Sequence, residues 1–141
     1  MKTLYADNVN YWKTSSSSPD KWMLKTMRLI TSIGGVIQGQ GFGSDVARGK
    51  AAYMLTFELE GQHFKLVWPV LPTRHKDDEL AARRQAATFI YHDVKARVMS
   101  AKVLGTRAAF FGYLQLKDGR TLTQVTLDEV LQGVPLFEAK V

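Results

Sequence analysis

Residues 51–71, "AAYMLTFELEGQHFKLVWPVL", contain the pattern that decides the fold. Large apolar side chains occupy every second position from Tyr53 to Leu59 and again from Phe64 to Val70. Successive side chains of a strand point to opposite faces, so each half predicts a strand with one apolar face. The intervening Gly61-Gln62 predicts a turn, and the whole stretch predicts a β-hairpin. Pro69 has no N–H to donate, which places its strand at a sheet edge or ends it there.

Helices are expected on both sides of this hairpin. Ser18-Pro19-Asp20 combines an N-cap, a first-turn proline and an acidic first turn, and Gly34-Gly35 ends the pattern, which predicts a helix over residues 18–33. A short strand is expected at residues 36–42. Residues 79–104 contain no breaker and predict the longest element, a helix. The apolar residues expected along one side of this helix are Leu80, Ala87, Tyr91, Val94, Val98 and Ala101.

The remaining residues predict smaller elements. Residues 106–116 are expected to be helical, with a strand as the alternative that their aromatic residues would also suit, and residues 117–120, "KDGR", form a turn. Thr126 and Glu129 fit a capping box for a last short helix that Gly133 and Pro135 end. The predicted fold class is α+β, with an antiparallel sheet of about three strands packed against a long helix and shorter flanking helices. An N-terminal arm and serine-rich joint, residues 1–17, precede a single α+β domain, residues 18–141.

Composition narrows the class of protein. The chain has 141 residues, which suggests one domain, and no cysteine, which excludes disulfides, thiolate catalysis and cysteine zinc sites. The N-terminal residues lack the apolar run of a signal peptide, and no stretch is long enough to span a membrane. A cytoplasmic protein without membrane contact is therefore expected. The net charge of +6 and a pI of about 9.7 favour polyanionic partners.

The glycine-rich residues 39–50, "GQGFGSDVARGK", invite a comparison with phosphate-binding loops. Five residues separate Gly43 from Gly49, where the P-loop motif requires four, and Ala51 stands where a magnesium-binding hydroxyl is needed. A nucleotide loop is therefore not expected. The preferred interpretation is a tight connection between two strands. The alternative is a loop whose Arg48 and Lys50 lie along a nucleic-acid backbone.

No catalytic centre is evident. The three histidines lie outside any metal-binding or nucleophile motif, and no cofactor, metal or catalytic residue is expected. The nearest enzyme pattern is a metal-dependent nuclease in which Glu58 and Glu60 share a strand face with Lys65 across the hairpin. His75 is a further candidate ligand, because it lies next to three acidic residues. The alternative is a solvated strand face with a cross-strand Glu–Lys pair.

The long helix is unusually basic. Residues 83–107 contain six Lys or Arg and a single acidic residue, Asp93. A solvated helix face explains such charge most often, but charge of one sign also suits a nucleic-acid surface. Exposed aromatic residues such as Phe42, Tyr53 or Trp68 could stack on bases or fill the core. The predicted nucleic-acid contacts are Arg83, Arg84, Lys95, Arg97 and Lys102 of the helix, with Arg48, Lys50, Arg74 and Lys76 in loops.

Residues 33–104 resemble a known family in the order of their elements. A helix, a glycine-bearing strand, a hairpin and a long basic helix follow one another, and "ARRQAATFIYHDVKARVMSAKVLG" is similar to the helix of phage-type single-strand annealing proteins. The resemblance implies a sheet backed by a long helix, ring-forming subunits, and a groove in which cations and backbone groups hold DNA phosphates. The segments "FKLVWPVLP" and "YHDVKAR" also resemble small uncharacterised proteins of phages and mobile elements.

Three functional hypotheses follow. The first is a non-enzymatic basic protein that binds or anneals single-stranded DNA in a phage or mobile-element context. The second is a protein-interaction or assembly subunit, such as a homo-oligomer, that pairs through an exposed strand edge and the aromatic arm with Tyr5, Tyr11 and Trp12. The third is the small metal-dependent nuclease.

Overall fold

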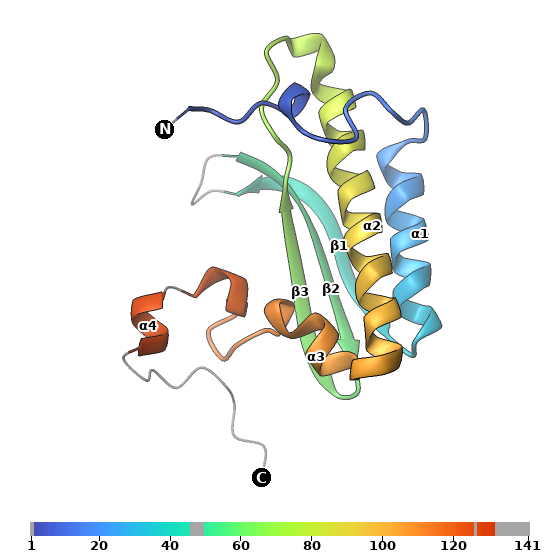
Figure 1. Cartoon of the computed structure of the whole chain (residues 1–141), viewed down its shortest axis with the longest axis vertical. Coiled ribbons are helices and arrows are strands. Elements are labelled where there is room, and N and C mark those ends of the chain that lie inside the picture. The colour runs from blue at the N-terminus through green and yellow to red at the C-terminus, as the bar shows by residue number, and fades with distance from the viewer. Residues whose placement is uncertain (1, 46–49, 126, 132–141) are drawn as a thin grey trace.

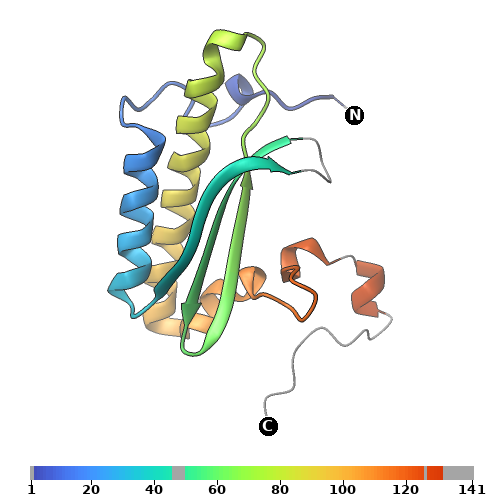
Figure 2. The ribbon, with the colours of Figure 1, turned by 180° about the vertical axis from the view of Figure 1, so that it is seen from behind.

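The computed structural model describes residues 2–45, 50–125 and 127–131 (Figure 1). Three antiparallel strands, β1 (Val36–Asp45), β2 (Lys50–Leu59) and β3 (Gln62–Pro69), form one sheet in the order β1-β2-β3. Helices α1 (Pro19–Ser32) and α2 (Glu79–Leu104) cover one face of this sheet and run in the same direction (Figures 1 and 2). The structure confirms the predicted α+β class, the hairpin and the long helix.

The β2–β3 hairpin turns over two residues with positive φ. Glu60 has φ 52° and Gly61 has φ 76°, and Leu59 pairs with Gln62. Two consecutive positive φ values are the geometry that matches the right-handed twist of the flanking strands. Glu60 therefore belongs to the turn, so the prediction that it shares a strand face with Glu58 was wrong.

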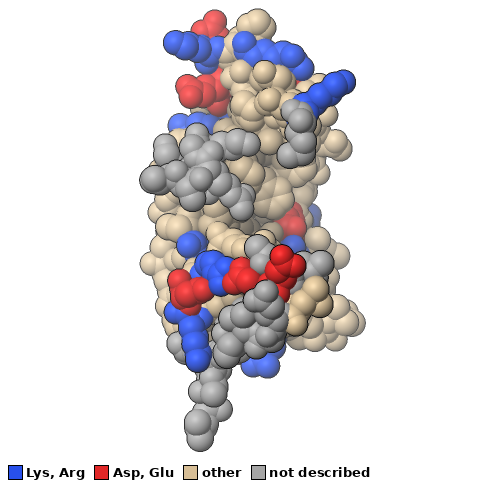
Figure 3. All heavy atoms as spheres, turned by 90° about the vertical axis from the view of Figure 1, so that its left-hand side faces the viewer, with Lys and Arg blue, Asp and Glu red and all other residues tan. Residues whose placement is uncertain are grey.

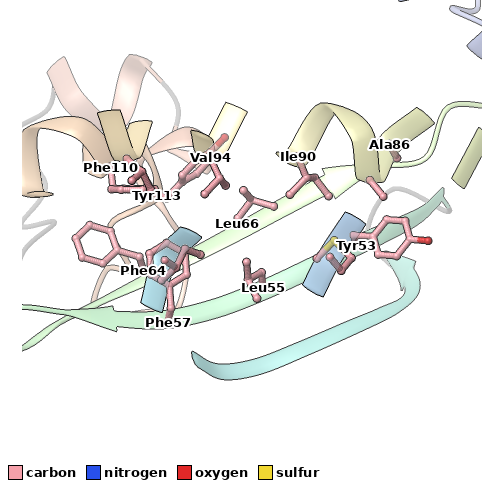
Figure 4. Close-up of a cluster of buried hydrophobic side chains, with 14 of the residues drawn as sticks. Tyr53, Leu55, Phe57, Phe64, Leu66, Ala86, Ile90, Val94, Phe110 and Tyr113 are labelled. Atoms are coloured by element: carbon pink, nitrogen blue, oxygen red, sulfur yellow. The ribbon is translucent and has the colours of Figure 1, made fainter. Parts of the chain in front are cut away.

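The apolar face of the hairpin forms the centre of the core. The alternating residues from Tyr53 to Leu59 are buried, and so are Phe64 and Leu66 of β3. Figure 4 shows Leu55 and Leu66 pointing towards Ile90 of α2. The predicted alternation is therefore confirmed. Of the two alternatives for Tyr53, base stacking or core packing, the structure shows core packing.

Helix α1 begins and ends with the predicted capping groups. The Ser18 side chain accepts a hydrogen bond from the backbone N–H of Lys21, and Pro19 occupies the first helical position. Gly34, with φ 89°, follows the last turn. The helix boundaries agree with the prediction to within one residue at each end.

Helix α2 buries most of the predicted side, but Tyr91 is only half-buried. Ala87, Val94, Val98 and Ala101 are buried, whereas the Leu80 side chain is 47% exposed. A helix of 26 residues is about 39 Å long, and an eight-residue strand spans about 26 Å. The first turn of α2, which contains Leu80, extends past the end of the sheet (Figure 1).

Strand β1 is longer than expected. Residues 39–45 of the glycine-rich stretch pair with β2, so the strand continues past its predicted end at residue 42, and a bulge lies between Ile37 and Gly39. A Cβ atom added at Gly41 or Gly43 would meet no atom within 4 Å, so packing does not require glycine there. The sheet order leaves the far edge of β1 without a strand partner among the described residues.

The segment after α2 packs against the lower part of the sheet. It contains α3 (Thr106–Phe110), η3 (Phe111–Tyr113), η4 (Leu122–Gln124) and α4 (Leu127–Leu131). Phe110 is fully buried, and its ring lies 5.6 Å from that of Phe57. Residues 106–110 are helical as expected, and Gly119, with φ 85°, lies in the predicted turn. The predicted cap Thr126, with Gly133 and Pro135, lies outside the described residues.

Residues 2–17, the N-terminal arm, fold back onto the domain. The arm contains η1 (Ala6–Asn8), and Ala6 is fully buried with its N–H bonded to the carbonyl of Pro72. The buried amide of Gln85 in α2 donates from Nε2 to the carbonyls of Ala6, Val9 and Asn10, at 2.8, 3.2 and 2.9 Å. One side chain thus fixes three points of the arm.

Among the described residues, no helix is both long and apolar enough to cross a membrane.

Replacing Gln85 with leucine should release the arm. The carbonyls of Ala6, Val9 and Asn10 would lose the Gln85 amide, and among the described residues only Ala6 would keep another donor, the Val9 N–H. A buried acceptor that loses its partner costs about 1–3 kcal/mol. We expect Gln85→Leu to lower the urea midpoint and to make the arm sensitive to limited proteolysis. Gln40→Leu, at an exposed position with no such bonds, is the matched control. Equal stability and equal protease resistance in the two variants would contradict this role of Gln85.

Candidate nucleic-acid interface

Helix α1 presents three cations on one exposed side. Lys21, Lys25 and Arg28 are spaced four and three residues apart, so they lie on the same face of the helix. The helical rise separates neighbouring members by about 4.5–6 Å along the axis. All three side chains are exposed, whereas Met23, Thr26 and Ile30 point into the core.

Aromatic rings fill the seam between α1 and α2. The Trp22 ring lies 5.1 Å from Tyr91 and 6.1 Å from His92, measured between ring centroids. The Lys25 ammonium lies 4.8 Å from the centroid of Trp22, and the Lys95 ammonium lies 5.9 Å from that of Tyr91. Lys25 and Lys95 therefore meet across one aromatic cluster, although 70 positions separate them in the sequence.

Lys102 extends this surface along α2. It follows Lys95 by seven residues, which is close to two helical turns, and both side chains are exposed. We define the helix-pair face as Lys21, Lys25, Arg28, Lys95 and Lys102. The structure thus brings two of the predicted contacts together with three cations of α1 that the sequence analysis had not included.

The helix-pair face carries charge of one sign. None of its five cations forms an ion pair with another described residue. The acidic residues of the two helices are Asp20, Glu79 and Asp93. Asp20 and Glu79 lie in first turns, and Asp93 is paired with Arg97. A polyanion would therefore meet unpaired cations on this face.

Arg97 lies in an internal network instead. Its Nε donates to Asp93 at 2.9 Å, its Nη1 donates to the carbonyl of Ala109 at 3.0 Å, and its guanidinium lies 4.4 Å from the Tyr113 ring centroid. The Tyr113 hydroxyl donates to the same Asp93 carboxylate at 2.8 Å. Burial, together with the Asp93 charge, raises the pKa of Tyr113 well above its usual range. Arg97 therefore ties α2 to the segment after it.

Arg83 is held against the sheet. Its Nε donates to the Tyr53 hydroxyl at 3.1 Å, and its guanidinium lies 4.1 Å from the centroid of Phe42. Burial raises the pKa of Tyr53, although Arg83 acts in the opposite direction. Arg83 and Arg97 thus lie apart from the helix-pair face.

The predicted loop cations do not gather at one site. Arg74 pairs with Asp7 at 3.1 Å and lies 4.2 Å from the Tyr5 ring centroid, and Lys76 is exposed. Lys50 begins β2, and Arg48 lies outside the described residues. On the side of the molecule opposite α1 and α2, the described atoms in the middle of the view are mostly uncharged, and basic and acidic residues lie next to one another below them (Figure 3).

The candidate metal ligands are separated. Glu58 pairs across the hairpin with His63, and Lys65 pairs with Thr56, so Glu58 and Lys65 are not directly opposite each other. The Nδ1 of His63 lies 3.0 Å from Oε1 of Gln38. His75 follows the other end of β3 (Figure 1). The described residues contain no group of three His, Asp or Glu placed to hold a metal ion.

Arg84 differs from every other cation of α2. It lines a cavity beneath residues 11–16, and its Nε is buried without a hydrogen-bond acceptor among the described residues. A buried donor without an acceptor costs about 1–3 kcal/mol. This predicted residue therefore occupies an environment that the sequence pattern did not indicate.

Stability measurements should separate Arg97 from Lys95. Arg97→Gln removes the ion pair with Asp93 and the bond to Ala109, so we expect a loss of about 1–3 kcal/mol in the free energy of unfolding. Lys95→Gln makes an equal charge change on an exposed side chain of the same helix. It should change the free energy of unfolding by no more than about 0.5 kcal/mol. Urea titrations of both variants provide the comparison, and similar losses would show that the network contributes nothing.

Comparison with known proteins supplies no relative from which a role could be transferred. No protein-family model matches the chain, and neither a curated protein nor a solved structure matches it. The resemblance to single-strand annealing proteins stays a prediction.

Proposed function

We propose that the chain is a non-enzymatic nucleic-acid-binding protein that holds single-stranded DNA along the helix-pair face. The observation that supports this most is the set of five exposed cations on two adjacent helices, none paired with another described residue. Contacts to phosphates account for most of the affinity of such proteins and fix the strand without reading its sequence.

The aromatic seam favours a single strand over a duplex. Trp22 and Tyr91 are partly exposed and His92 is exposed, so parts of these rings are accessible to unstacked bases near the two rows of cations. Stacking on aromatic side chains requires bases that are free of a duplex partner. A basic groove with aromatic rings along it is the arrangement that non-specific single-strand binders use. Annealing in a phage or mobile-element setting is part of the same proposal.

A second function, assembly with another copy of the chain, is favoured by one observation. Strand β1 has ten residues, and its outer edge carries no strand partner within the described residues. Residues 36–44 contain no Lys, Arg or Pro, the residues that usually protect such an edge. The arm contributes less to this hypothesis than expected, because Tyr5 contacts Arg74 and Tyr11 stacks on His92 within the chain.

Single-strand binding should be steep in salt and should depend on the helix-pair face. Five phosphate contacts predict a slope of log K against log salt of about −3.5 for a single strand. Lys25→Gln/Lys95→Gln should reduce the size of this slope by about 1.4 and weaken binding at every salt concentration. Fluorescence anisotropy with a labelled oligonucleotide, as a single strand and as a duplex, measures both quantities.

The matched control for this measurement is Lys2→Gln/Lys117→Gln, because both residues are exposed and lie outside α1 and α2. The control should keep the slope of the unmodified protein. A slope that falls as much in the control as in Lys25→Gln/Lys95→Gln would mean that binding follows net charge alone. No binding at low salt would refute the proposal.

Self-assembly through β1 should respond to charge on that strand. Gln40→Lys/Gly41→Lys places one lysine on each face of β1; Gln40 is exposed, and a Cβ at Gly41 meets no atom within 4 Å. The variant should fold normally and sediment as a monomer, whereas the unmodified chain should sediment as a larger species without nucleic acid. Gln115→Lys, on another exposed side chain, is the control. If the unmodified chain is monomeric at high concentration, self-assembly through β1 is excluded.

A further inference from the structure

A cavity lies at one end of the helix-pair face. Its volume is about 580 Å³, and it is bounded by residues 11–16 of the arm and the first turns of α2. Trp22 connects the two regions, because its Nε1 donates to Ser15 of the cavity at 3.2 Å while its ring contacts Tyr91 of the aromatic seam. A strand that follows the helix-pair face towards the N-terminal end of α2 reaches this cavity.

Arg84 supplies a charged donor to the cavity. Its Nε is buried and has no acceptor within the described part of the chain. Buried polar groups almost always have a partner, and a guanidinium can only donate. The partner that completes this group is therefore an acceptor, and an anionic oxygen is the acceptor that a guanidinium binds most strongly.

Hydroxyl groups supply further donors. The Ser15 oxygen accepts two hydrogen bonds, from the N–H of Ser17 at 3.1 Å and from Nε1 of Trp22. A hydroxyl has two acceptor sites and one hydrogen, so Ser15 keeps its hydrogen for a third partner. Thr14 and Ser16 also line the cavity. The cavity thus combines three hydroxyls with one guanidinium.

The charges around the cavity balance, so the number of hydrogen-bond acceptors on a ligand selects the kind of anion. Lys13 pairs with Asp78 at 2.9 Å, which leaves Asp77 and Arg84 as the other charged lining residues. Since the cations and carboxylates of the lining balance, a phosphodiester with a single charge gains little there. A terminal phosphate monoester carries a charge of about −1.5 to −2 at pH 7 and three acceptor oxygens.

We propose that this cavity binds the terminal phosphate of a nucleic-acid strand held on the helix-pair face, with Arg84 and the hydroxyls of residues 14–16 as donors. This inference rests on the proposed function, because the helix-pair face delivers the strand. Because the charge of the lining is balanced, the cavity attracts a free phosphate only weakly. A phosphate attached to the bound strand has a higher local concentration at the cavity, so this attachment is necessary.

The test compares one labelled single strand with a 5′-phosphate, a 3′-phosphate or hydroxyls at both ends, in anisotropy titrations. We expect one phosphorylated form to bind about tenfold more tightly than the strand without phosphate. Arg84→Lys keeps the charge but removes the guanidinium donors, so it should abolish this preference and leave the affinity for the hydroxyl-ended strand nearly unchanged. Lys117→Arg is the matched control and should keep the preference.

The outcomes separate this inference from the proposed function. If all three strands bind equally and Arg84→Lys changes nothing, the cavity inference is overturned while the helix-pair face stands. If Lys25→Gln/Lys95→Gln leaves binding intact, the proposed function fails first. Inorganic phosphate is the competitor that tests the source: the inference expects competition only at concentrations far above that of the strand. Inorganic phosphate that binds Arg84 as tightly as the phosphorylated strand would assign the cavity to the free ion and overturn the inference.

Discussion

Burial of the hairpin's apolar face against α2 is the interaction on which the other features depend. Leu55 and Leu66 are fully buried beneath Ile90, and each such side chain contributes about 1.5–3 kcal/mol relative to exposure. A three-stranded sheet has room for two helices on this face, so α1 lies beside α2 and in the same direction (Figure 1). The polar sides of both helices then turn outward together. Packing thus places Lys25 beside Lys95 and creates a shared basic surface.

The parts of the fold that follow from local pattern could be predicted from the sequence. Alternation over residues 53–59 and 64–70 has one solution, because a slip of one residue would expose the whole apolar set. The exceptions depend on distant partners. Residues 43–45 continue β1 past its predicted end because β2 supplies the hydrogen bonds. Leu80 follows the helical period of α2, but its side chain is exposed. Its exposure depends on where the sheet ends, and helical periodicity carries no information about that.

The candidate site was predictable to a smaller extent. Lys95 and Lys102 share a helix face by their spacing, which the sequence shows directly. The same spacing is present at Lys21 and Lys25, but only the contact between helices makes these residues part of one surface. Arg97 fits the basic pattern equally well, and its role is decided by Tyr113, which lies beyond the end of the helix. The cations of one helix can therefore be sorted into those with internal contacts and those that are exposed only when the neighbouring elements are known.

The arm makes Arg84 the most distinct of these cations. Arg84 precedes Lys95 by three helical turns and lies on the same side of α2, yet residues 11–16 enclose it in a cavity. Tyr11 and Lys13 adopt left-handed backbone conformations, with φ of 67° and 54°, and such conformations cost on the order of 1–3 kcal/mol each. The three bonds from Gln85 and the Tyr11–His92 stacking offset this cost. The chain therefore maintains a strained segment where it covers a guanidinium whose Nε has no acceptor among the described residues, as expected if this cover itself has a function.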